Sequence, residues 1–136
     1  MDEQVISVDI KNFTKKELQC RCCGKFVKND KALIALQSFR DYLNRLFKKE
    51  VRLYITCGTR CTKHNKEVRG AAGSYHLTGE AFDVFSTDIS ASQIYNAAIF
   101  SNLFPTIIQY TKSQFIHLDT RAIDNKKTPF HWIEHK

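Results

Sequence analysis

The sequence predicts an α+β fold, in which a small, mainly antiparallel sheet has helices packed on it. One long segment, residues 30–48, carries apolar side chains at three- and four-residue spacing, which is the pattern of an amphipathic helix. Four short segments are apolar or alternate apolar with polar residues, as strands do: 51–56, 80–85, 106–110 and 114–119. The chain has 136 residues and no repeat or Pro/Gly-rich linker, so we expect a single domain over residues 1–136.

Two short sequences have the form of a capping box, in which a Ser or Thr and a Glu or Gln three residues later satisfy each other's backbone N–H groups. Thr14 and Glu17 form the first, so a short helix should begin there and lead into a Cys-rich turn. Ser90 and Gln93 form the second, which should open a helix that runs through about Phe100.

The long helix should bury one face against the core. Its expected apolar stripe runs through Leu33, Leu36, Leu43 and Leu46, and the charged side chains, Arg40 among them, lie off this stripe. The two strands at 106–110 and 114–119 are expected to form a hairpin around residues 111–113. With 43% hydrophobic and 12% aromatic residues, the chain has enough apolar material for a packed core, which argues against disorder.

The chain is basic, with 21 Lys and Arg against 14 Asp and Glu and a formal charge of +7. Such a surface suits a polyanionic partner such as nucleic acid, anionic lipid or a bacterial wall polymer, or simply keeps the protein soluble. We expect no nucleic-acid partner, because no helix-turn-helix or RNP-like aromatic pattern is present. No apolar run approaches the roughly 20 residues that span a bilayer, and no apolar segment follows the acidic start at Met1, so we expect synthesis in the cytoplasm without a signal peptide.

The five cysteines are Cys20, Cys22, Cys23, Cys57 and Cys61. Their odd number in a chain without a recognisable secretion signal argues against a disulfide framework. Cys20-x-x-Cys23 and Cys57-x-x-x-Cys61 have the spacing of half-sites for a structural zinc ion. Because the flanking residues lack regularly spaced paired knuckles, we expect buried or half-buried free thiols, and a second metal site stays the alternative.

Three side chains suggest a catalytic metal site at a face of the sheet. Asp83 lies in an apolar strand, where an ionised carboxylate is costly unless it is paired or binds a metal. His76 precedes it by seven residues, with a turn at Gly79 between them, and His117 lies in another apolar strand. Each alone is more simply explained as a hydrogen-bonded core residue. Together, two His and one carboxylate with a fourth position open to water form the pattern of a catalytic zinc site.

The order of four sequence blocks resembles the zinc D-alanyl-D-alanine carboxypeptidase and murein endopeptidase family. The blocks are Ser74-x-His76-x-x-Gly79-x-Ala81-x-Asp83, Phe115-Ile-His117-Leu-Asp119, Phe13 to Gly24, and Cys57-Gly-Thr-Arg60-Cys-Thr-Lys-His64-Asn65. They cover nearly the whole chain. The resemblance implies one Zn²⁺ per chain, held by His76, Asp83 and His117.

The resemblance also assigns roles around the metal. Ser74 would order the site or contact substrate, and Arg60 would polarise the scissile carbonyl or hold substrate, with a structural salt bridge as the simpler alternative for Arg60. Relatives place a base just before the last zinc ligand, but Gln114 and Phe115 cannot serve as one. Asp119 shares the face of His117 in an alternating strand, so we expect it to be either the general base or a partner of a zinc ligand.

The function implied is that of a zinc metallopeptidase that hydrolyses an amide bond in peptidoglycan peptides, as a carboxypeptidase or an endopeptidase. The alternative is a catalytically silent relative that binds wall peptide or has a structural role, which the missing acid at position 114 favours. A small, basic enzyme without a leader would fit an endolysin-like protein released by a phage-type route to act on the cell wall. We expect a monomer, since nothing in the sequence points to an obligate dimer.

Overall fold

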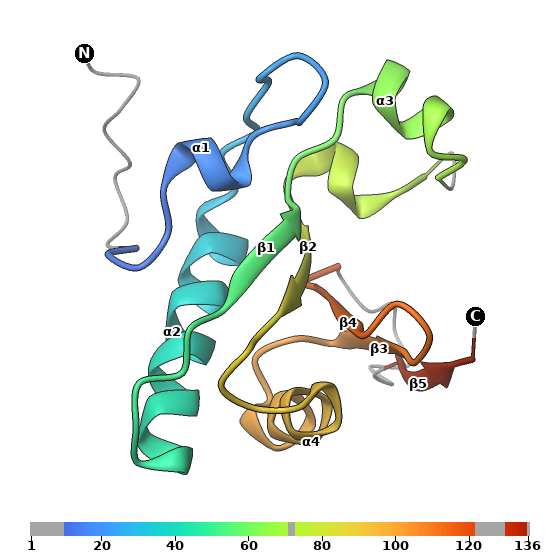
Figure 1. Ribbon diagram of the computed structural model, residues 1–136. Coiled ribbons are helices and arrows are strands. Elements are labelled where there is room, and N and C mark those ends of the chain that lie inside the picture. Colours follow the sequence, from blue (N-terminus) through green and yellow to red (C-terminus); the bar gives the residue numbers. More distant parts are fainter. Residues whose placement is uncertain (1–9, 71–72, 122–129, 136) are drawn as a thin grey trace.

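The computed structural model describes residues 10–70, 73–121 and 130–135 (Figure 1). Most of the helical elements precede β2, and the last three described elements are all strands. The helical elements are α1 (Lys15–Leu18), α2 (Asp30–Phe47), α3 (Thr62–Glu67), the 3₁₀ turn η2 (Tyr75–Thr78) and α4 (Ala91–Ser101). The strands are β1 (Tyr54–Cys57), β2 (Ala81–Phe85), β3 (Thr106–Tyr110), β4 (Phe115–Asp119) and β5 (Phe130–Glu134).

The strands described here form one sheet in the order β1-β2-β4-β3-β5. Neighbouring strands are antiparallel except for β3 and β5, which run parallel. The predicted fold class, α+β with a mainly antiparallel sheet, is therefore confirmed. β3 and β4 form the predicted hairpin, with Tyr110 opposite Phe115 at its closed end. No helix in the described ranges is long and apolar enough to cross a membrane.

The two faces of the sheet have different surroundings because side chains alternate along each strand. One face packs against α2 and α4 and forms the hydrophobic core. Its strand residues are fully or nearly fully buried: Ile55, Phe82, Val84, Ile107, Ile116 and Leu118. The opposite face carries Asp83 and His117, so burial of the apolar face fixes the side on which the polar residues lie.

The helix caps follow the sequence closely. Both predicted capping boxes are present, at Thr14 with Glu17 and at Ser90 with Gln93. Helix α1 is nevertheless only four residues long and ends at Leu18, before the Cys-rich turn. The predicted first strand is also shorter than expected, because β1 begins at Tyr54 rather than at residue 51.

The predicted apolar stripe of α2 needs two corrections. Leu33, Leu36 and Leu43 are buried as expected, but Leu46, near the end of the helix, is 49% exposed. Arg40 is buried instead of lying off the stripe, and its Nη2 lies 3.2 Å from Oε2 of Glu50. A long guanidinium side chain can bury its stem while its charged end reaches a carboxylate near the surface, which periodicity alone does not predict.

Phe39 on α2 provides a test of the core. Its ring is fully buried and meets Phe104 edge-on at 5.9 Å between ring centroids. We expect Phe39→Ala to lower the free energy of unfolding by about 3–5 kcal/mol, since it removes buried apolar area and leaves a cavity. Phe100→Ala, at a side chain that is 76% exposed, is the matched control and should change stability by about 0.5 kcal/mol or less. Urea denaturation of both variants measures the difference, and equal effects would contradict this packing.

Candidate metal centre

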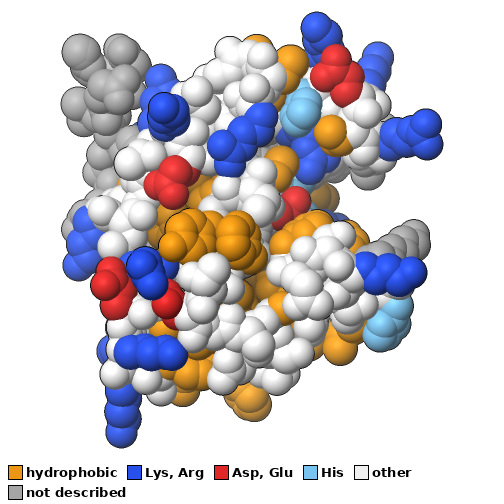
Figure 2. Space-filling model, viewed as in Figure 1, with side chains coloured by type: hydrophobic (Ala, Val, Ile, Leu, Met, Phe, Trp, Pro, Cys, Tyr) orange, Lys and Arg blue, Asp and Glu red, His pale blue; other side chains and the backbone are white. Residues whose placement is uncertain are grey.

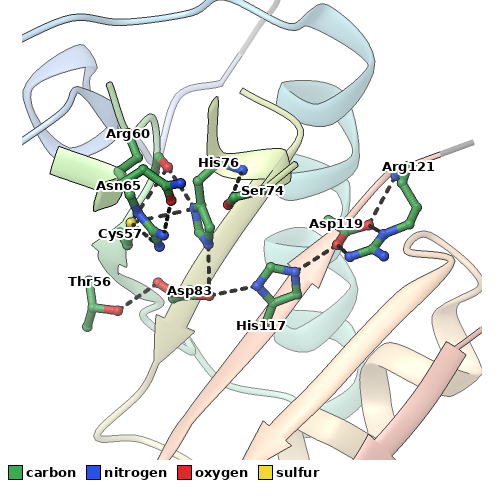
Figure 3. A network of polar contacts seen from close by, with 11 residues as sticks. Thr56, Cys57, Arg60, Asn65, Ser74, His76, Asp83, His117, Asp119 and Arg121 are labelled. Atoms are coloured by element: carbon green, nitrogen blue, oxygen red, sulfur yellow. Dashed lines mark hydrogen bonds and ion pairs between the residues drawn. The ribbon is translucent and has the colours of Figure 1, made fainter. Parts of the chain in front are cut away.

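The site is built on one row of residues that crosses the sheet. Asp83 on β2 lies directly opposite His117 on β4, and His117 lies opposite Ile108 on β3. Ile108 in turn lies beside Trp132 on β5. Residues paired across a sheet point to the same face, so this row projects away from the hydrophobic core. Cross-strand register therefore brings together Asp83 and His117, which are far apart in the sequence (Figure 3).

Strand β1 extends this row through a β-bulge. Ile55 pairs with Val84, and the next pair is Cys57 with Asp83, so Thr56 is an extra residue in β1. Such a bulge shifts the alternation of the strand by one position and changes the direction of the following side chain. The Thr56 hydroxyl donates to the main-chain oxygen of Asp83 (3.2 Å), and Cys57 is the residue of β1 that pairs with Asp83.

His76 comes from the turn η2 rather than from the sheet. The hydroxyl of Ser74 accepts a hydrogen bond from the backbone N–H of His76 (3.2 Å) and so caps the start of this turn. Gly79 ends it with a positive φ of 75°. A side chain at position 79 would also collide with the main-chain oxygen of Val27. The Ser74 to Gly79 segment thus folds back on itself and brings His76 to the same face as Asp83, as the motif predicted.

The hydrogen bonds of the two imidazoles indicate which nitrogens face a common point. Nδ1 of His76 donates to the main-chain oxygen of Gly58 (2.8 Å), which leaves Nε2 directed at Oδ1 of Asp83 (3.3 Å). Nε2 of His117 lies 2.7 Å from Oδ2 of Asp119, which leaves Nδ1 directed at the same Asp83 oxygen (3.0 Å). Figure 3 shows the three side chains converging. Two ring nitrogens and a carboxylate oxygen that meet in this way fit the donor set of a catalytic zinc ion.

Cys57 lies close to these residues and offers a second combination of donors. Its sulfur, a nitrogen of His76 and an oxygen of Asp83 lie within 4.8 Å of one another. The sulfur contacts Nδ1 of His76 (3.5 Å), however, which is the nitrogen already bound to Gly58. Cys57 therefore supports the ring of His76 from behind, whereas His117 and Asp83 share the side that Nε2 faces.

Charge in this cluster stabilises protonated imidazoles next to ionised carboxylates. Burial lowers the pKa of His76, but its hydrogen bonds to Asp83 and Cys57 raise it by more, to about 10. Burial likewise opposes ionisation of Asp83, yet the hydrogen bonds with His117 and His76 hold the pKa of that carboxyl well below its usual range. For His117, burial is outweighed by Asp119 and Asp83, so its pKa is raised. In the metal-free protein, protonation of both imidazoles is thus favoured on the side that faces Asp83, where a metal ion would bond.

Asp119 is fully buried and both of its oxygens are engaged. Oδ2 accepts from His117 Nε2, and Arg121 donates from Nη2 to the same oxygen (2.6 Å) and from Nε to Oδ1 (2.9 Å). The guanidinium of Arg121 also lies over the ring of Tyr75, 4.2 Å from its centroid. A carboxylate held in this way fixes the orientation of His117 and keeps its Nδ1 directed at Asp83.

Arg60 approaches the site from the loop between β1 and α3. Its Nη1 donates to Oδ1 of Asn65 (2.8 Å) and its Nη2 to the sulfur of Cys57 (3.3 Å). Its Nε is buried without a hydrogen-bond partner in the described part of the chain. No ion pair of Arg60 is found among those residues, so the salt-bridge alternative gains no support. A cationic side chain therefore lies beside the metal-ligand candidates.

A cavity of about 480 Å³ lies over the row of site residues. Figure 2 shows the surface hollowed between the part around α3 and the part around the β3–β4 hairpin. Its polar lining consists of Arg60, Ser74, His76, Asp83, His117 and Arg121, and its aromatic lining of Tyr75, Tyr110, Phe115 and Trp132. This is a polar floor with aromatic walls, open to a chain-like ligand.

Besides the metal-ligand candidates His76, Asp83 and His117, sequence reasoning found Ser74, Arg60 and Asp119. The structure places all six residues at or directly beside this cavity, whereas two features were not predicted. Sequence reasoning missed Arg121, which continues the alternation of His117 and Asp119 beyond the end of β4 and could have been found by that spacing. It also missed that the tail at Trp132 belongs to a strand. The aromatic and β-branched residues Phe130, Trp132 and Ile133 favour a strand, but no turn sequence joins the tail to β3, so its parallel partner could not be predicted.

The site combines a His-Asp-His arrangement, whose donor atoms fit a catalytic metal ion, with a cavity that these residues line. The comparison with family models gives the particular family: residues 11–119 match the model described as Peptidase M15. The chain belongs to the peptidase M15 family, a class of metallopeptidases, and a peptide is accordingly its class of substrate. The search of the curated proteins gave no match to this chain.

The pKa shifts predict how the stability of the metal-free protein depends on pH. The raised pKa of His76 contributes stability that is complete below the unfolded value of about 6.5 and is lost as pH rises towards about 10. The lowered pKa of Asp83 contributes stability that is lost below the unfolded value of about 3.9. After chelation, the melting temperature should therefore decrease between about pH 6.5 and pH 10. In His76→Ala the alkaline decrease should be smaller, and an identical profile in both proteins would contradict the pairing.

Proposed function

We propose that the protein is a zinc-dependent peptidase that hydrolyses an amide bond in the peptide part of bacterial peptidoglycan. The observation that carries this proposal is the convergence of His76 Nε2 and His117 Nδ1 on one oxygen of Asp83 at the bottom of the cavity. The membership in the peptidase M15 family supports the reaction class. The basic charge of +7 suits a wall polymer as substrate.

His76, Asp83 and His117 would hold the zinc ion. When bound there, zinc supplies Lewis-acid polarisation of the scissile carbonyl and activation of a water molecule. The ligands must release their protons first, so the raised pKa values of both imidazoles make zinc affinity increase with pH. The main-chain oxygen of Gly58 and the carboxylate of Asp119 hold the two rings in the tautomers that binding requires.

Arg60 and Ser74 are the residues proposed to meet the substrate. Arg60 lines the cavity and its guanidinium is held by Asn65 and Cys57, so its positive charge can stabilise a peptide carbonyl or the charge that develops on it. Ser74 lines the same cavity, and its hydroxyl also orders the turn that carries His76. The aromatic walls formed by Tyr110, Phe115 and Trp132 offer apolar contact to the flanking part of a peptide.

For Asp119 we propose the role of positioning residue, the second of the two roles expected from the sequence. Its carboxylate is fully buried, bonds the outward nitrogen of His117 and is paired with Arg121, so it lies behind the ligand. A general base must reach the attacking water directly or through one further water. The position of Asp119 behind the ring favours orientation of His117 over proton transfer.

The second candidate function is a silent relative that binds wall peptide without cleaving it. One observation favours it: within the described ranges, Asp83 is the only carboxylate that lines the cavity. The two candidates differ in turnover and not in metal content. The reaction products distinguish removal of a terminal D-alanine from cleavage of a cross-link, and the expression context tests the proposed phage-type release to the wall.

Zinc analysis with an activity assay tests the central proposal. Purified protein should contain zinc, and it should release amines from peptidoglycan. His117→Ala should lose the zinc of this centre together with all detectable hydrolysis, because two remaining ligands hold zinc poorly. His135→Ala, at an exposed histidine outside the cavity, is the control and should keep both. Zinc and peptidoglycan binding without amine release would identify the silent relative, and unchanged zinc and turnover in His117→Ala would exclude this centre.

Asp119 variants separate orientation from proton transfer. Asp119→Asn keeps an oxygen that can accept from His117 Nε2, whereas Asp119→Ala removes it. For a positioning residue, we expect zinc affinity to fall by about 10–100-fold in Asp119→Ala and by less in Asp119→Asn. Competition with a zinc-chelating dye measures these affinities. A loss of turnover in Asp119→Asn with unchanged zinc affinity and loss of the acidic limb of the pH profile would instead make Asp119 the base.

A further inference from the structure

The Cys-rich turn after α1 has a compact and specific backbone conformation. The N–H of Gly24 donates to the main-chain oxygen of Cys20 (2.9 Å), and the N–H of Cys20 donates to that of Lys25 (2.7 Å). Gly24 adopts a positive φ of 79°. Residues 20–25 therefore close into a tight loop that contains both Cys20 and Cys23, and Cys-x-x-Cys is the ligand spacing of many structural zinc sites.

A third sulfur reaches this loop from a distant part of the sequence. The sulfur atoms of Cys20, Cys23 and Cys61 lie within 4.8 Å of one another. Two sulfurs on one tetrahedral zinc ion at Zn–S distances of about 2.3 Å are about 3.8 Å apart, so small side-chain shifts would suffice. Cys61 is thus associated with the loop at residues 20–25, whereas the spacing in the sequence had paired it with Cys57.

Backbone N–H groups point at these sulfurs. The N–H of Cys61 donates to the sulfur of Cys20 (3.3 Å), and the backbones of Cys22 and Cys23 donate to it as well. The N–H of His64 donates to the sulfur of Cys61 (3.4 Å) at the start of α3. Such donors stabilise negative charge on sulfur, and metal-binding cysteines are thiolates.

Three further residues border the cluster. Cys22, His64 and Glu67 place their ligand atoms within 4.8 Å of one another, and the thiol of Cys22 also contacts that of Cys61. Cys22 is the middle residue of the loop and its side chain is exposed. His64 stands three residues after Cys61, and its Nδ1 lies 3.6 Å from Oε1 of Glu67. A carboxylate beside one ring nitrogen is the usual support for a histidine that binds metal through the other.

We propose that Cys20, Cys23 and Cys61 bind a second zinc ion, with His64 as the fourth ligand. Three thiolates and an imidazole with no open position form a structural site rather than a catalytic one. The proposal is independent of catalysis at the His76, Asp83 and His117 centre. It raises the zinc content expected from one ion per chain to two.

The position of this site gives it a consequence for the cavity. Cys61 follows Arg60 directly, and the N–H of Arg60 donates to the main-chain oxygen of His76 (2.9 Å). The N–H of Thr59 donates to the main-chain oxygen of Leu18 (2.8 Å), just before the Cys-rich loop. The segment 58–61 is therefore held between the cysteine cluster and the turn of His76. A zinc ion in the cluster would fix Arg60 relative to the metal ligands.

Metal stoichiometry with cobalt substitution tests the proposal without any activity assay. Wild-type protein should bind two zinc ions, Cys23→Ser and His117→Ala one each, and the double variant none. Cys23 is exposed, so its replacement should leave the core intact. With Co²⁺, the thiolate-to-metal charge-transfer absorption should be strong in wild type and in His117→Ala and absent in Cys23→Ser. Cys57→Ser, which removes a thiol outside the cluster, should keep it.

The experiment tests the two proposed metal centres independently of each other. One zinc ion in both wild type and Cys23→Ser, or a disulfide between two of the three cysteines in place of metal, would overturn the second site and leave the first standing. Retention of both ions in His117→Ala would affect only the catalytic centre. His64→Ala should release the second zinc ion to a chelator at least about tenfold faster than Cys22→Ser does, and the reverse order would overturn His64 as the fourth ligand.

Discussion

The register between β2 and β4 is the constraint on which the site depends. It places Asp83 opposite His117 and, by alternation, places Phe82, Val84, Ile116 and Leu118 in the core. A slip of one residue would exchange the two faces and bury a charged pair where apolar side chains now pack. Packing of α2 and α4 on the apolar face thus holds two metal-ligand candidates in contact on the opposite face. Stability of the core and geometry of the centre have the same origin.

The buried charges in this centre are tolerated because each has a partner. Asp83 faces two imidazoles, and Asp119 is shared by His117 and Arg121. Removal of one member would leave an uncompensated buried charge, which is far more costly than loss of a surface ion pair. The ion pairs that link Asp83, His117, Asp119 and Arg121 therefore form a single electrostatic unit. Substitutions within it should not be additive.

Local signals in the sequence were reliable, and non-local ones were not. The capping boxes at Thr14 and Ser90, the β3–β4 hairpin and the turn at Gly79 all depend on residues close in sequence, and the structure has each of them. The fold class followed from the same patterns. The parallel pairing of β5, the burial of Arg40 and the approach of Cys61 to Cys20 and Cys23 depend on contacts between distant segments. Spacing alone contains no information about such contacts, and the ligand triad was found only because a known motif already encodes them.

The extra residue in β1 has a consequence for comparison with related chains. Thr56 lies between the paired positions Ile55 and Cys57, and it shifts the strand so that Cys57 stands beside Asp83. An insertion or deletion of one residue in this strand would exchange the side chains on its two faces from that point to Gly58, whose main-chain oxygen holds His76. Length in this segment is therefore more tightly constrained than residue identity. A gap placed there in a sequence alignment would represent a different centre rather than a harmless loop change.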